Sequence, residues 1–228
     1  TGVFAFRAAP NQVNFLGYPG TMGTTCHDWI IADDYVIPSD FLSDYSERVA
    51  RLPHFFMPYD LRSDFRSLER RTARADYGLP DEAFVYASFN DFHKITAVMF
   101  ESWVELWIAF RGSLSEADFL EMFATRGIDP SRVIIALKVE RFDDHLARLS
   151  LADLMLDTYP YNSHTTACDA ISVGLPLLTI SGRSFASRVS GSLLTELGMT
   201  ELITNTLEEY EATAIGLAES VADYRALR

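Results

Sequence analysis

Four polar residues near the middle of the stretch 151–182 have the types and spacing of a site for an anion and for hydroxyl groups. His164, Thr165 and Thr166 follow a loop rich in turn-forming residues and would fill the first turn of a helix. The free backbone N–H groups and the helix dipole attract an anion at such an end, so a phosphate fits there. Asp169 follows the two threonines by three and four residues, so it shares their helix face and could accept hydrogen bonds from ligand hydroxyls.

Two other polar segments carry candidates for the same site. Lys94 and Asn90 come directly after a predicted strand, where the lysine could reach a phosphate as a point charge. His145 and Arg148 are one helical turn apart and share a face. For each residue alone the ordinary interpretation is a solvated lysine, the polar face of an amphipathic helix, or helix capping. The convergence of all three segments on one edge of a sheet is what favours a functional site.

Alternating strands and helices would bring these segments together. Residues 151–156 form an apolar run typical of a buried strand, Ser163 is predicted to cap the following helix, and Gly174 with Pro176 to end it. Further strands are predicted at 84–88, 104–110, 133–137 and 177–180, and further helices at 97–103, 115–126, 142–149, 185–197 and 206–228. This alternation predicts an α/β fold with a doubly wound parallel sheet. The loops 89–94, 137–145 and 157–166 would then gather at its carboxyl edge.

The front of the chain has a different composition. Short strands are predicted at 1–7, 12–16, 29–32 and 48–52, with a glycine-rich loop at 17–23 and a short helix at 39–45. Five arginines and little apolar periodicity mark the connector that follows. We therefore expect three parts: residues 1–60, a connector at 61–79, and residues 80–228 as a larger second domain.

The composition is that of a folded protein, with 228 residues, 48% hydrophobic and 22% charged. The formal net charge of −13 argues against a nucleic-acid partner, because the surface would repel phosphate backbones. The sequence contains no long apolar run for a membrane span and no signal-peptide pattern, so we expect no membrane partner and a cytoplasmic setting. Cys26 and Cys168 are expected to be buried free thiols.

Four segments, in order along the chain, carry a family resemblance: QVNFLGYPGTMG, YGLPDEAFVYASFNDFHKIT, ADLMLDTYPYNSHTTACDAISVGLPLLTISGRSFASRV and LGMTELI. They resemble the catalytic region of the protein O-linked N-acetylglucosamine transferases, and more closely the bacterial relatives that carry tetratricopeptide repeats. The resemblance covers nearly the whole chain. It implies that residues 1–60 are the remnant of an N-terminal catalytic domain on the acceptor side, and that residues 80–228 are a C-terminal nucleotide-sugar-binding domain after the connector 61–79. It implies a two-domain glycosyltransferase-B type fold and transfer of N-acetylglucosamine from UDP-N-acetylglucosamine, without a metal or other cofactor, to Ser or Thr hydroxyls of a protein acceptor with inversion.

The resemblance also implies roles for individual residues. Lys94 and the helix start with His164 would act in catalysis at the diphosphate. The substrate-binding residues it implies are Thr165 and Thr166 at the diphosphate, His145 and Asp169 at the ribose, Arg148 near the uracil, Leu16 and Gly17 near the sugar, Asn90 beside Lys94, and Tyr161 near the N-acetyl group. The phosphate position agrees with the one that the helix start predicts by itself.

The chain departs from the family pattern near these residues. Asp91 and His93 stand where relatives show an amide and a tyrosine, Phe142 stands where a lysine is common, and Tyr161 replaces a smaller residue. The family's N-terminal repeats and most of its first catalytic domain do not precede the glycine-rich loop here, and they are expected as partners. The segment that joins Lys94 to the next strand is also shorter than in the family.

Three functional hypotheses follow. The first is inverting transfer of N-acetylglucosamine, in which Lys94 and the helix start stabilise the departing UDP. His164 and His93 are the candidate bases, although a phosphate oxygen or a residue outside the chain could take the acceptor proton instead. The second is a related protein glycosyltransferase with another donor, GDP-fucose or UDP-glucose. The third is a non-catalytic nucleotide-binding or scaffold module.

Overall fold

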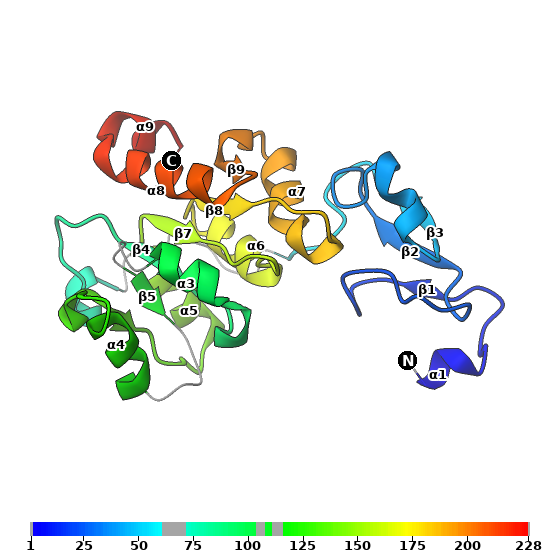
Figure 1. The fold of residues 1–228 in the computed structure, drawn as a ribbon, viewed down its shortest axis with the longest axis horizontal. Helices are drawn as coiled ribbons and strands as arrows, with labels where there is room; N and C mark the ends of the chain where they lie inside the picture. Colours follow the sequence, from blue (N-terminus) through cyan, green and yellow to red (C-terminus); the bar gives the residue numbers. More distant parts are fainter. Residues whose placement is uncertain (1, 61–71, 104–107, 111–115, 228) are drawn as a thin grey trace.

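Two parallel sheets organise the chain in the computed structural model, which describes residues 2–60, 72–103, 108–110 and 116–227. Figure 1 shows the larger sheet with its helices at one end of the molecule and the smaller sheet at the other. The larger sheet has the order β6-β5-β4-β7-β8-β9, and every neighbouring pair is parallel. Its strands are β4 (Tyr86–Ser88), β5 (Ile108–Phe110), β6 (Ile134–Ile135), β7 (Leu154–Leu156), β8 (Leu177–Ile180) and β9 (Ile203–Thr204).

The strand order reverses between β4 and β7. From β4 the chain moves outward through β5 to β6, then returns to β7 beside β4 and moves outward again to β9. In sheets of this kind ligands bind in the crevice outside the carboxyl ends of the strands, at the point of reversal. The predicted doubly wound parallel sheet is confirmed, and the loops after β4 and β7 are the ones that flank this crevice.

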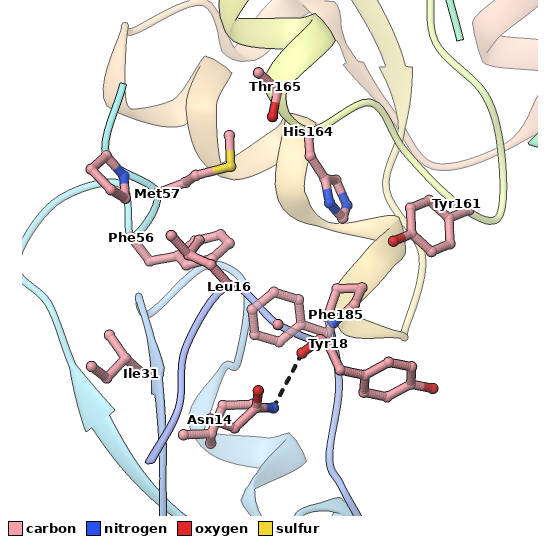
Figure 2. Close-up of a pocket in the computed structure, with 14 residues that line it drawn as sticks. Asn14, Leu16, Tyr18, Ile31, Phe56, Met57, Tyr161, His164, Thr165 and Phe185 are labelled. Atoms are coloured by element: carbon pink, nitrogen blue, oxygen red, sulfur yellow. Dashed lines mark hydrogen bonds between the residues drawn. The ribbon is translucent and has the colours of Figure 1, made fainter. Parts of the chain in front are cut away.

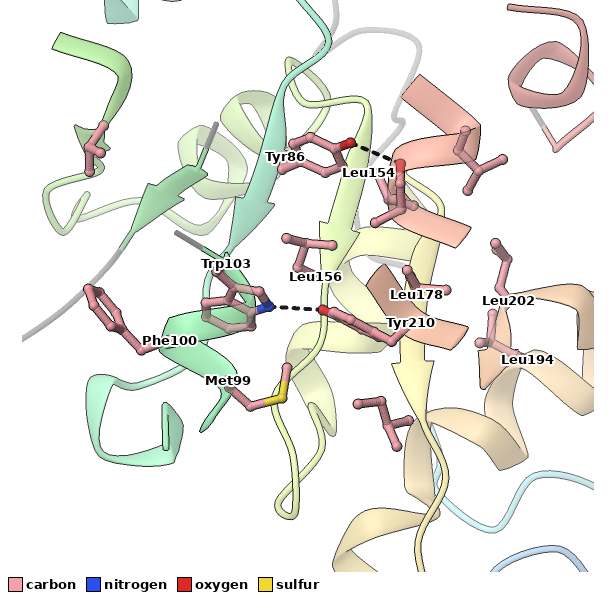
Figure 3. Packing of buried hydrophobic residues seen from close by; sticks show 14 of the residues in the cluster. Tyr86, Met99, Phe100, Trp103, Leu154, Leu156, Leu178, Leu194, Leu202 and Tyr210 are labelled. Atoms are coloured by element: carbon pink, nitrogen blue, oxygen red, sulfur yellow. Dashed lines mark hydrogen bonds between the residues drawn. The ribbon is translucent and has the colours of Figure 1, made fainter. Parts of the chain in front are cut away.

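Alternating side chains of the strands build a core on each face of the sheet. Leu154 and Leu156 of β7 pack on one face with residues of α3, α4 and α8, whereas Met155 packs on the other with residues of α5 and α6. Side chains alternate in this way because successive strand residues point to opposite faces. Figure 3 shows the first of these cores. Each fully buried leucine contributes about 2 kcal/mol to folding, so the two apolar layers hold the sheet between helices.

The helices agree well with the predicted ones. They are α3 (Ala97–Trp103), α4 (Glu116–Ala124), α5 (Phe142–Leu149), α6 (Thr165–Ser172), α7 (Val189–Glu196), α8 (Leu207–Glu219) and α9 (Val221–Leu227), with short 3₁₀ turns between them: η3 (Arg74–Tyr77), η4 (Phe92–Lys94), η5 (Pro130–Arg132), η6 (Phe185–Ser187) and η7 (Thr200–Leu202). The short connection after Lys94 is a seven-residue helix, α3, before the parallel strand β5. No helix in the described ranges is long and apolar enough to cross a membrane.

Two helices that were predicted as continuous are each broken into two elements. Residues 185–197 divide into η6 and α7, because Ser184 caps a separate turn by accepting from Ser187 N and because Arg188 has φ −123° and ψ −6°. Residues 206–228 divide into α8 and α9 at Ser220, whose φ of −108° and ψ of 95° are extended. The predicted cap of α8 is confirmed, since the Thr206 hydroxyl accepts from Glu209 N. The predictions missed both breaks because they depend on single backbone conformations.

The smaller sheet has the order β1-β2-β3, and its strands β1 (Val13–Asn14), β2 (Trp29–Ala32) and β3 (Arg48–Arg51) are parallel. The predicted short helix is η1 (Ser39–Asp44), and the predicted strand at 1–7 is wrong, because α1 (Gly2–Ala5) is a helical turn. Its backbone bonds locally, with Phe6 N donating to Val3 O and Arg7 N to Phe4 O. The interior of the predicted connector, residues 61–71, lies outside the described residues.

The two sheets meet through the segment of η6 and α7. Ser192 Oγ donates to Asp33 Oδ2 at 2.6 Å, and the same carboxylate oxygen accepts from Phe56 N at 3.0 Å. Phe185 packs edge-on against Phe56 in a core shared by both parts. In Figure 1, α7 lies on the side of the larger part that faces β2 and β3. The residues that close the crevice from the front of the chain are therefore fixed to the larger part by buried contacts.

Substituting Gly191 by alanine should open this junction. A Cβ atom at Gly191 would meet the Tyr35 hydroxyl and ring at 2.5 to 2.8 Å, so α7 or Tyr35 must shift. Such overpacking costs about 1 to 3 kcal/mol of folding free energy, measurable by urea unfolding. Gly216→Ala, on the exposed side of α8 with nothing within 4 Å, is the matched control and should be neutral or stabilising. Equal effects of the two substitutions, or an undiminished cost of Gly191→Ala in a Tyr35→Ala background, would contradict this account of the junction.

Candidate functional site

A buried aspartate shapes the loop that follows β7. Asp157 is 1% exposed, and its Oδ1 accepts from Thr158 N at 2.8 Å and from Ser163 N at 2.6 Å. Its Oδ2 accepts from the Thr179 hydroxyl at 2.7 Å. Three hydrogen bonds to one carboxylate fold the six residues after it back toward the sheet. The loop 157–163 is thus held in one conformation ahead of helix α6.

Helix α6 begins at Thr165, and its N-cap is His164 rather than the predicted Ser163. Ser163 is fully buried and serves another purpose. Its hydroxyl accepts from Asn90 Nδ2 at 2.6 Å, and its carbonyl oxygen accepts from the Ser190 hydroxyl at 2.9 Å. The first backbone N–H groups of a helix have no partner within it, and those of Thr165 and Thr166 are in that position. The start of α6 is therefore a rigidly supported site for an anion.

Lys94 reaches this helix start from the loop after β4. Its Nζ donates to Asn162 O at 3.0 Å and lies 4.3 Å from the centre of the Tyr161 ring. Burial lowers the pKa of Lys94, while the charges of Asp157 and Asp91 oppose that shift. Lys94 thus places a partly desolvated ammonium group beside the start of α6. This agrees with the expectation that the loops after β4 and β7 meet at the carboxyl edge of the sheet.

His164 is a neutral imidazole at physiological pH. Burial and, to a smaller extent, the charge of Lys94 lower its pKa to about 4, although a hydrogen bond with the backbone of Ala186 partly offsets them. Its ring stacks on Tyr161 with 5.0 Å between centroids and an interplanar angle of 26°. An imidazole with so low a pKa is a weak base, so its chemistry at neutral pH is hydrogen bonding.

The low pKa of His164 has a consequence for stability. Its folded pKa of about 4 lies below the ordinary value of 6.5, so the unfolded chain binds more protons between these pH values. Folding free energy should therefore decrease as the pH falls from about 6.5 to about 4, by up to roughly 3 kcal/mol. Urea unfolding of His164→Gln should lack this component, and His54→Gln is the control, since His54 is an exposed surface partner of Glu196. An identical pH dependence in His164→Gln and in the wild type would contradict the assignment.

A cavity of about 270 Å³ lies between the start of α6 and the front of the chain. Figure 2 shows His164, Thr165 and Tyr161 on one side of it, and Leu16, Tyr18 and Phe56 opposite. Gly17 also lines it, so the structure brings both predicted loop residues to the cavity. None of the described residues that line it is Asp, Glu, Lys or Arg. The cavity is accordingly suited to an uncharged polar group beside the anion site.

Buried polar contacts hold the glycine-rich loop against this cavity. Asn14 is 6% exposed, and its Nδ2 donates to Tyr18 O at 3.1 Å and to Gly20 O at 3.0 Å. Leu16 has φ +60°, which is uncommon for a residue with a side chain. Glu47 holds the other end, since its carboxylate accepts from Met22 N at 2.6 Å. The loop is thus fixed at both ends.

A second group of predicted residues lies one helical turn further along α6. Asp169 Oδ2 is 3.7 Å from His145 Nε2, and His145 Nδ1 is 3.2 Å from Arg148 Nη2. Arg148 also donates to Leu137 O and lies 5.1 Å from the Phe89 ring. A further cavity of about 220 Å³ is lined here by Lys138, Val139, Glu140, Arg141, Phe142, His145 and Arg148. The group combines a hydroxyl acceptor with a planar cation and an aromatic ring.

The structure thus brings the predicted residues together as two groups joined by α6. Lys94, Asn90, Tyr161, His164 and Thr165 form the first with the glycine-rich loop, and Thr166 follows half-buried on the helix. The second consists of His145, Arg148 and Asp169.

The sequence interpretation missed two residues of the site. Tyr59 donates its hydroxyl to Asp169 Oδ1 at 2.8 Å, across 110 positions, and no local pattern marks it. Burial raises the pKa of Tyr59 to about 12, so it stays a donor. Asp157 was treated only as part of a loop, although an acid directly after a buried strand is a signal that could have identified it.

A family model described as Glycosyl transferase family 41 matches residues 1–73 and 69–228. The chain is 34% identical over 241 residues to a protein of Arabidopsis thaliana named "Probable UDP-N-acetylglucosamine--peptide N-acetylglucosaminyltransferase SEC", covering 99% of the chain and 24% of that protein. It is 31% identical to a protein of Oryza sativa subsp. japonica with the same activity in its name and the designation SPINDLY, covering 100% of the chain and 25% of that protein. The chain spans about a quarter of the length of these curated relatives.

Two solved structures are similar to the chain. A mutant of the O-GlcNAc transferase of Thermobaculum terrenum superimposes with a TM-score of 0.84 at 26% identity, over 98% of this chain and 44% of that one. A UDP-forming trehalose-phosphate synthase of Burkholderia xenovorans superimposes with a TM-score of 0.56 at 14% identity, over 89% of this chain and 56% of that one, a likeness of fold alone. Together they confirm the α/β fold of glycosyltransferase-B type that the resemblance implies.

Proposed function

Because the chain belongs to glycosyl transferase family 41, we propose that it holds the nucleotide-sugar site of an inverting, metal-independent protein O-glycosyltransferase. The donor is UDP-N-acetylglucosamine, and the acceptor is a Ser or Thr hydroxyl of a protein. The names of the relatives from Arabidopsis and rice support this donor and a peptide acceptor. The observation that carries the proposal is the meeting of Lys94 with the start of α6 at the reversal point of the sheet.

The diphosphate binds at this meeting point. The backbone N–H groups and hydroxyls of Thr165 and Thr166 face it with the positive end of the helix dipole. Lys94 supplies a full positive charge, and its partners in the structure are a carbonyl oxygen and an aromatic face. A phosphate oxygen offers the ammonium group a stronger partner than either of these.

The nucleoside and the sugar extend from the diphosphate in opposite directions. The ribose hydroxyls donate to Asp169 beside His145, and the uracil lies near Arg148 at the cavity of about 220 Å³. The sugar enters the uncharged cavity, next to Leu16, Gly17 and Tyr161. An uncharged wall suits a sugar that carries hydroxyl and N-acetyl groups but no charge.

The chemical step places negative charge on the departing UDP. The acceptor oxygen attacks the anomeric carbon, the bond from that carbon to the β-phosphate oxygen breaks, and UDP leaves with the electron pair. Lys94 and the start of α6 stabilise that charge, which is the main electrostatic requirement of the reaction. His164, neutral and weakly basic, donates or accepts a hydrogen bond at this point, and the acceptor proton leaves to a phosphate oxygen or to a group outside the chain.

Several parts of the proposal go beyond the nucleotide site. Residues 1–60 act as the acceptor side and 80–228 as the donor side, with 61–79 between them. The acceptor protein and the additional segments of the longer relatives are the partners. A cytoplasmic setting and the lack of a nucleic-acid partner stay predictions from the sequence.

The experiment for this function compares donors. The chain should release UDP from UDP-N-acetylglucosamine faster in the presence of an acceptor protein, and the sugar should appear on Ser or Thr by mass spectrometry. UDP should raise the melting temperature more than GDP does, which separates this donor from GDP-fucose. UDP-glucose as the better donor would move the proposal to another sugar. Stabilisation by UDP without any transfer or donor hydrolysis would leave a nucleotide-binding module.

A further inference from the structure

We propose that Asp157 is a positioning residue: its hydrogen bonds hold the loop that Lys94 contacts, and its buried negative charge favours the ammonium group that Lys94 presents to the diphosphate. This inference rests on the proposed function, because only a diphosphate ligand requires the ammonium form of Lys94. Nothing in the family resemblance or the comparisons assigns Asp157 a role.

Asp157 is a buried charge without a cation of its own. It is 1% exposed, and its carboxylate accepts three hydrogen bonds, all from neutral donors: Thr158 N, Ser163 N and the Thr179 hydroxyl. Among the described residues no Lys, Arg or His nitrogen lies within 4.0 Å of it. A buried carboxylate costs several kcal/mol unless hydrogen bonds and a nearby charge compensate it. The three hydrogen bonds offset part of this cost, and the field of the charge extends to its neighbours.

The negative charge of Asp157 acts on the ammonium group of Lys94. The two residues lie in the loops after β4 and β7, on either side of the reversal point. Lys94 donates to Asn162 O within the loop that Asp157 holds, so the same loop carries both its hydrogen-bond partner and its counter-charge. Burial alone would lower the pKa of Lys94, and the charge of Asp157 is the larger of the two that raise it.

The other charged and titratable groups around Lys94 do not replace Asp157. Asp91, in the same loop as Lys94, is exposed, so solvent screens its charge. His164 at the start of α6 is neutral, and Tyr161 presents its ring face to the ammonium group. Asp157 is buried, so solvent does not screen its charge, and in the proposed complex its carboxylate does not touch the phosphate oxygens. Burial of Lys94 disfavours the ammonium form, although that form is the one that binds phosphate strongly. The charge of Asp157 opposes this effect of burial.

The sequence offers a direct test, because it contains only two lysines, Lys94 and Lys138. With ¹³Cε-labelled lysine, NMR gives one signal for each, and the pKa of each can be followed by pH titration without any ligand. Asp157→Asn keeps the size of the side chain and the oxygen that accepts from Ser163 N, but removes the charge. It should lower the pKa of Lys94, because it removes the larger of the two negative charges that favour the ammonium form. Lys138 should titrate as in the wild type.

Thr179→Val is the matched control, since it removes the hydrogen bond to Asp157 Oδ2 and keeps the charge. The pKa of Lys94 should stay at its wild-type value in this variant. An unchanged Lys94 pKa in Asp157→Asn, or an equal shift in Thr179→Val, would overturn the inference. If the asparagine variant does not fold, Asp157→Glu keeps the charge with altered hydrogen bonds, and a Lys94 pKa that falls in it would overturn the inference as well.

A second measurement connects the charge to the ligand. UDP affinity measured by calorimetry should begin to weaken as the pH rises through the pKa of Lys94, and in Asp157→Asn that onset should move to lower pH. Coincident onsets in the two proteins would overturn the inference even if the NMR shift is seen. Failure of the wild-type chain to bind UDP at any pH would instead overturn the proposed function, and the NMR titration would still decide the role of Asp157.

Discussion

Replacing Lys94 by alanine should weaken UDP binding by roughly 30- to 150-fold, the equivalent of about 2 to 3 kcal/mol for one hydrogen bond to a charged group. Sugar transfer should fall below detection, because in the proposed mechanism the same ammonium group stabilises the leaving UDP. The chain has few substitutes for it. Within the described residues, no other Lys or Arg donates to the loop 157–163. Calorimetry with UDP, and UDP release from the donor, are the two measurements.

Arg225→Ala is the control for this substitution. It removes the same charge from the exposed surface of α9 and should change UDP affinity less than twofold at physiological salt. Both variants should keep the wild-type melting temperature within about 2 °C, since neither removes a buried side chain from the core. Wild-type UDP affinity in Lys94→Ala would eliminate Lys94 as a diphosphate ligand.

Replacing Tyr210 by phenylalanine should destabilise the protein by about 2 to 4 kcal/mol, because the Tyr210 hydroxyl makes two buried hydrogen bonds that phenylalanine cannot make. Figure 3 shows the Tyr210 hydroxyl accepting from Trp103 Nε1, at 3.2 Å. The same hydroxyl donates to Asp157 O at 3.1 Å, and Tyr210 is fully buried. Phenylalanine has nearly the same shape, so the loss comes from hydrogen bonding rather than from a cavity. The melting temperature should fall by about 4 to 16 °C.

Tyr86→Phe is the control that measures the stability cost of losing one buried hydroxyl hydrogen bond. The Tyr86 hydroxyl is also buried and makes one such bond, donating to Ala214 O at 2.9 Å. Its loss should therefore cost about half as much, about 1 to 2 kcal/mol. Because Tyr210 also supports the backbone of Asp157, Tyr210→Phe should lower UDP affinity as well, whereas Tyr86→Phe should not. Equal costs of the two substitutions would contradict the double role of Tyr210.

Periodicity and stop signals were sufficient to predict most of the fold. Helices 97–103 and 142–149 and strand 29–32 have the predicted bounds, because apolar spacing and flanking turn residues determine them locally. The strand at 1–7 was wrong, since an apolar run forms a strand only where a neighbour pairs with it. The breaks at Arg188 and Ser220 depend on tertiary contacts, such as the bond from Arg188 Nε to Tyr35 O.

The candidate site was predicted in part for a similar reason. The start of α6 and Lys94 are local features at strand ends, and the parallel order of the sheet brings them together. Tyr59 and the burial of Asp157 depend on contacts between distant segments, which no local pattern contains. The neutral state of His164 could not be predicted either, because its pKa depends on burial and on the charge of Lys94.

Calorimetric titration of the wild-type chain with UDP and with GDP decides whether Lys94 and the start of α6 form a uridine diphosphate site. We expect one UDP to bind per chain, and GDP to bind at least about tenfold more weakly, a difference of about 1.4 kcal/mol. UDP-N-acetylglucosamine should bind at the same stoichiometry and compete with UDP. The absence of heat with UDP, or an affinity for GDP equal to that for UDP, would contradict a uridine diphosphate site at Lys94 and the start of α6.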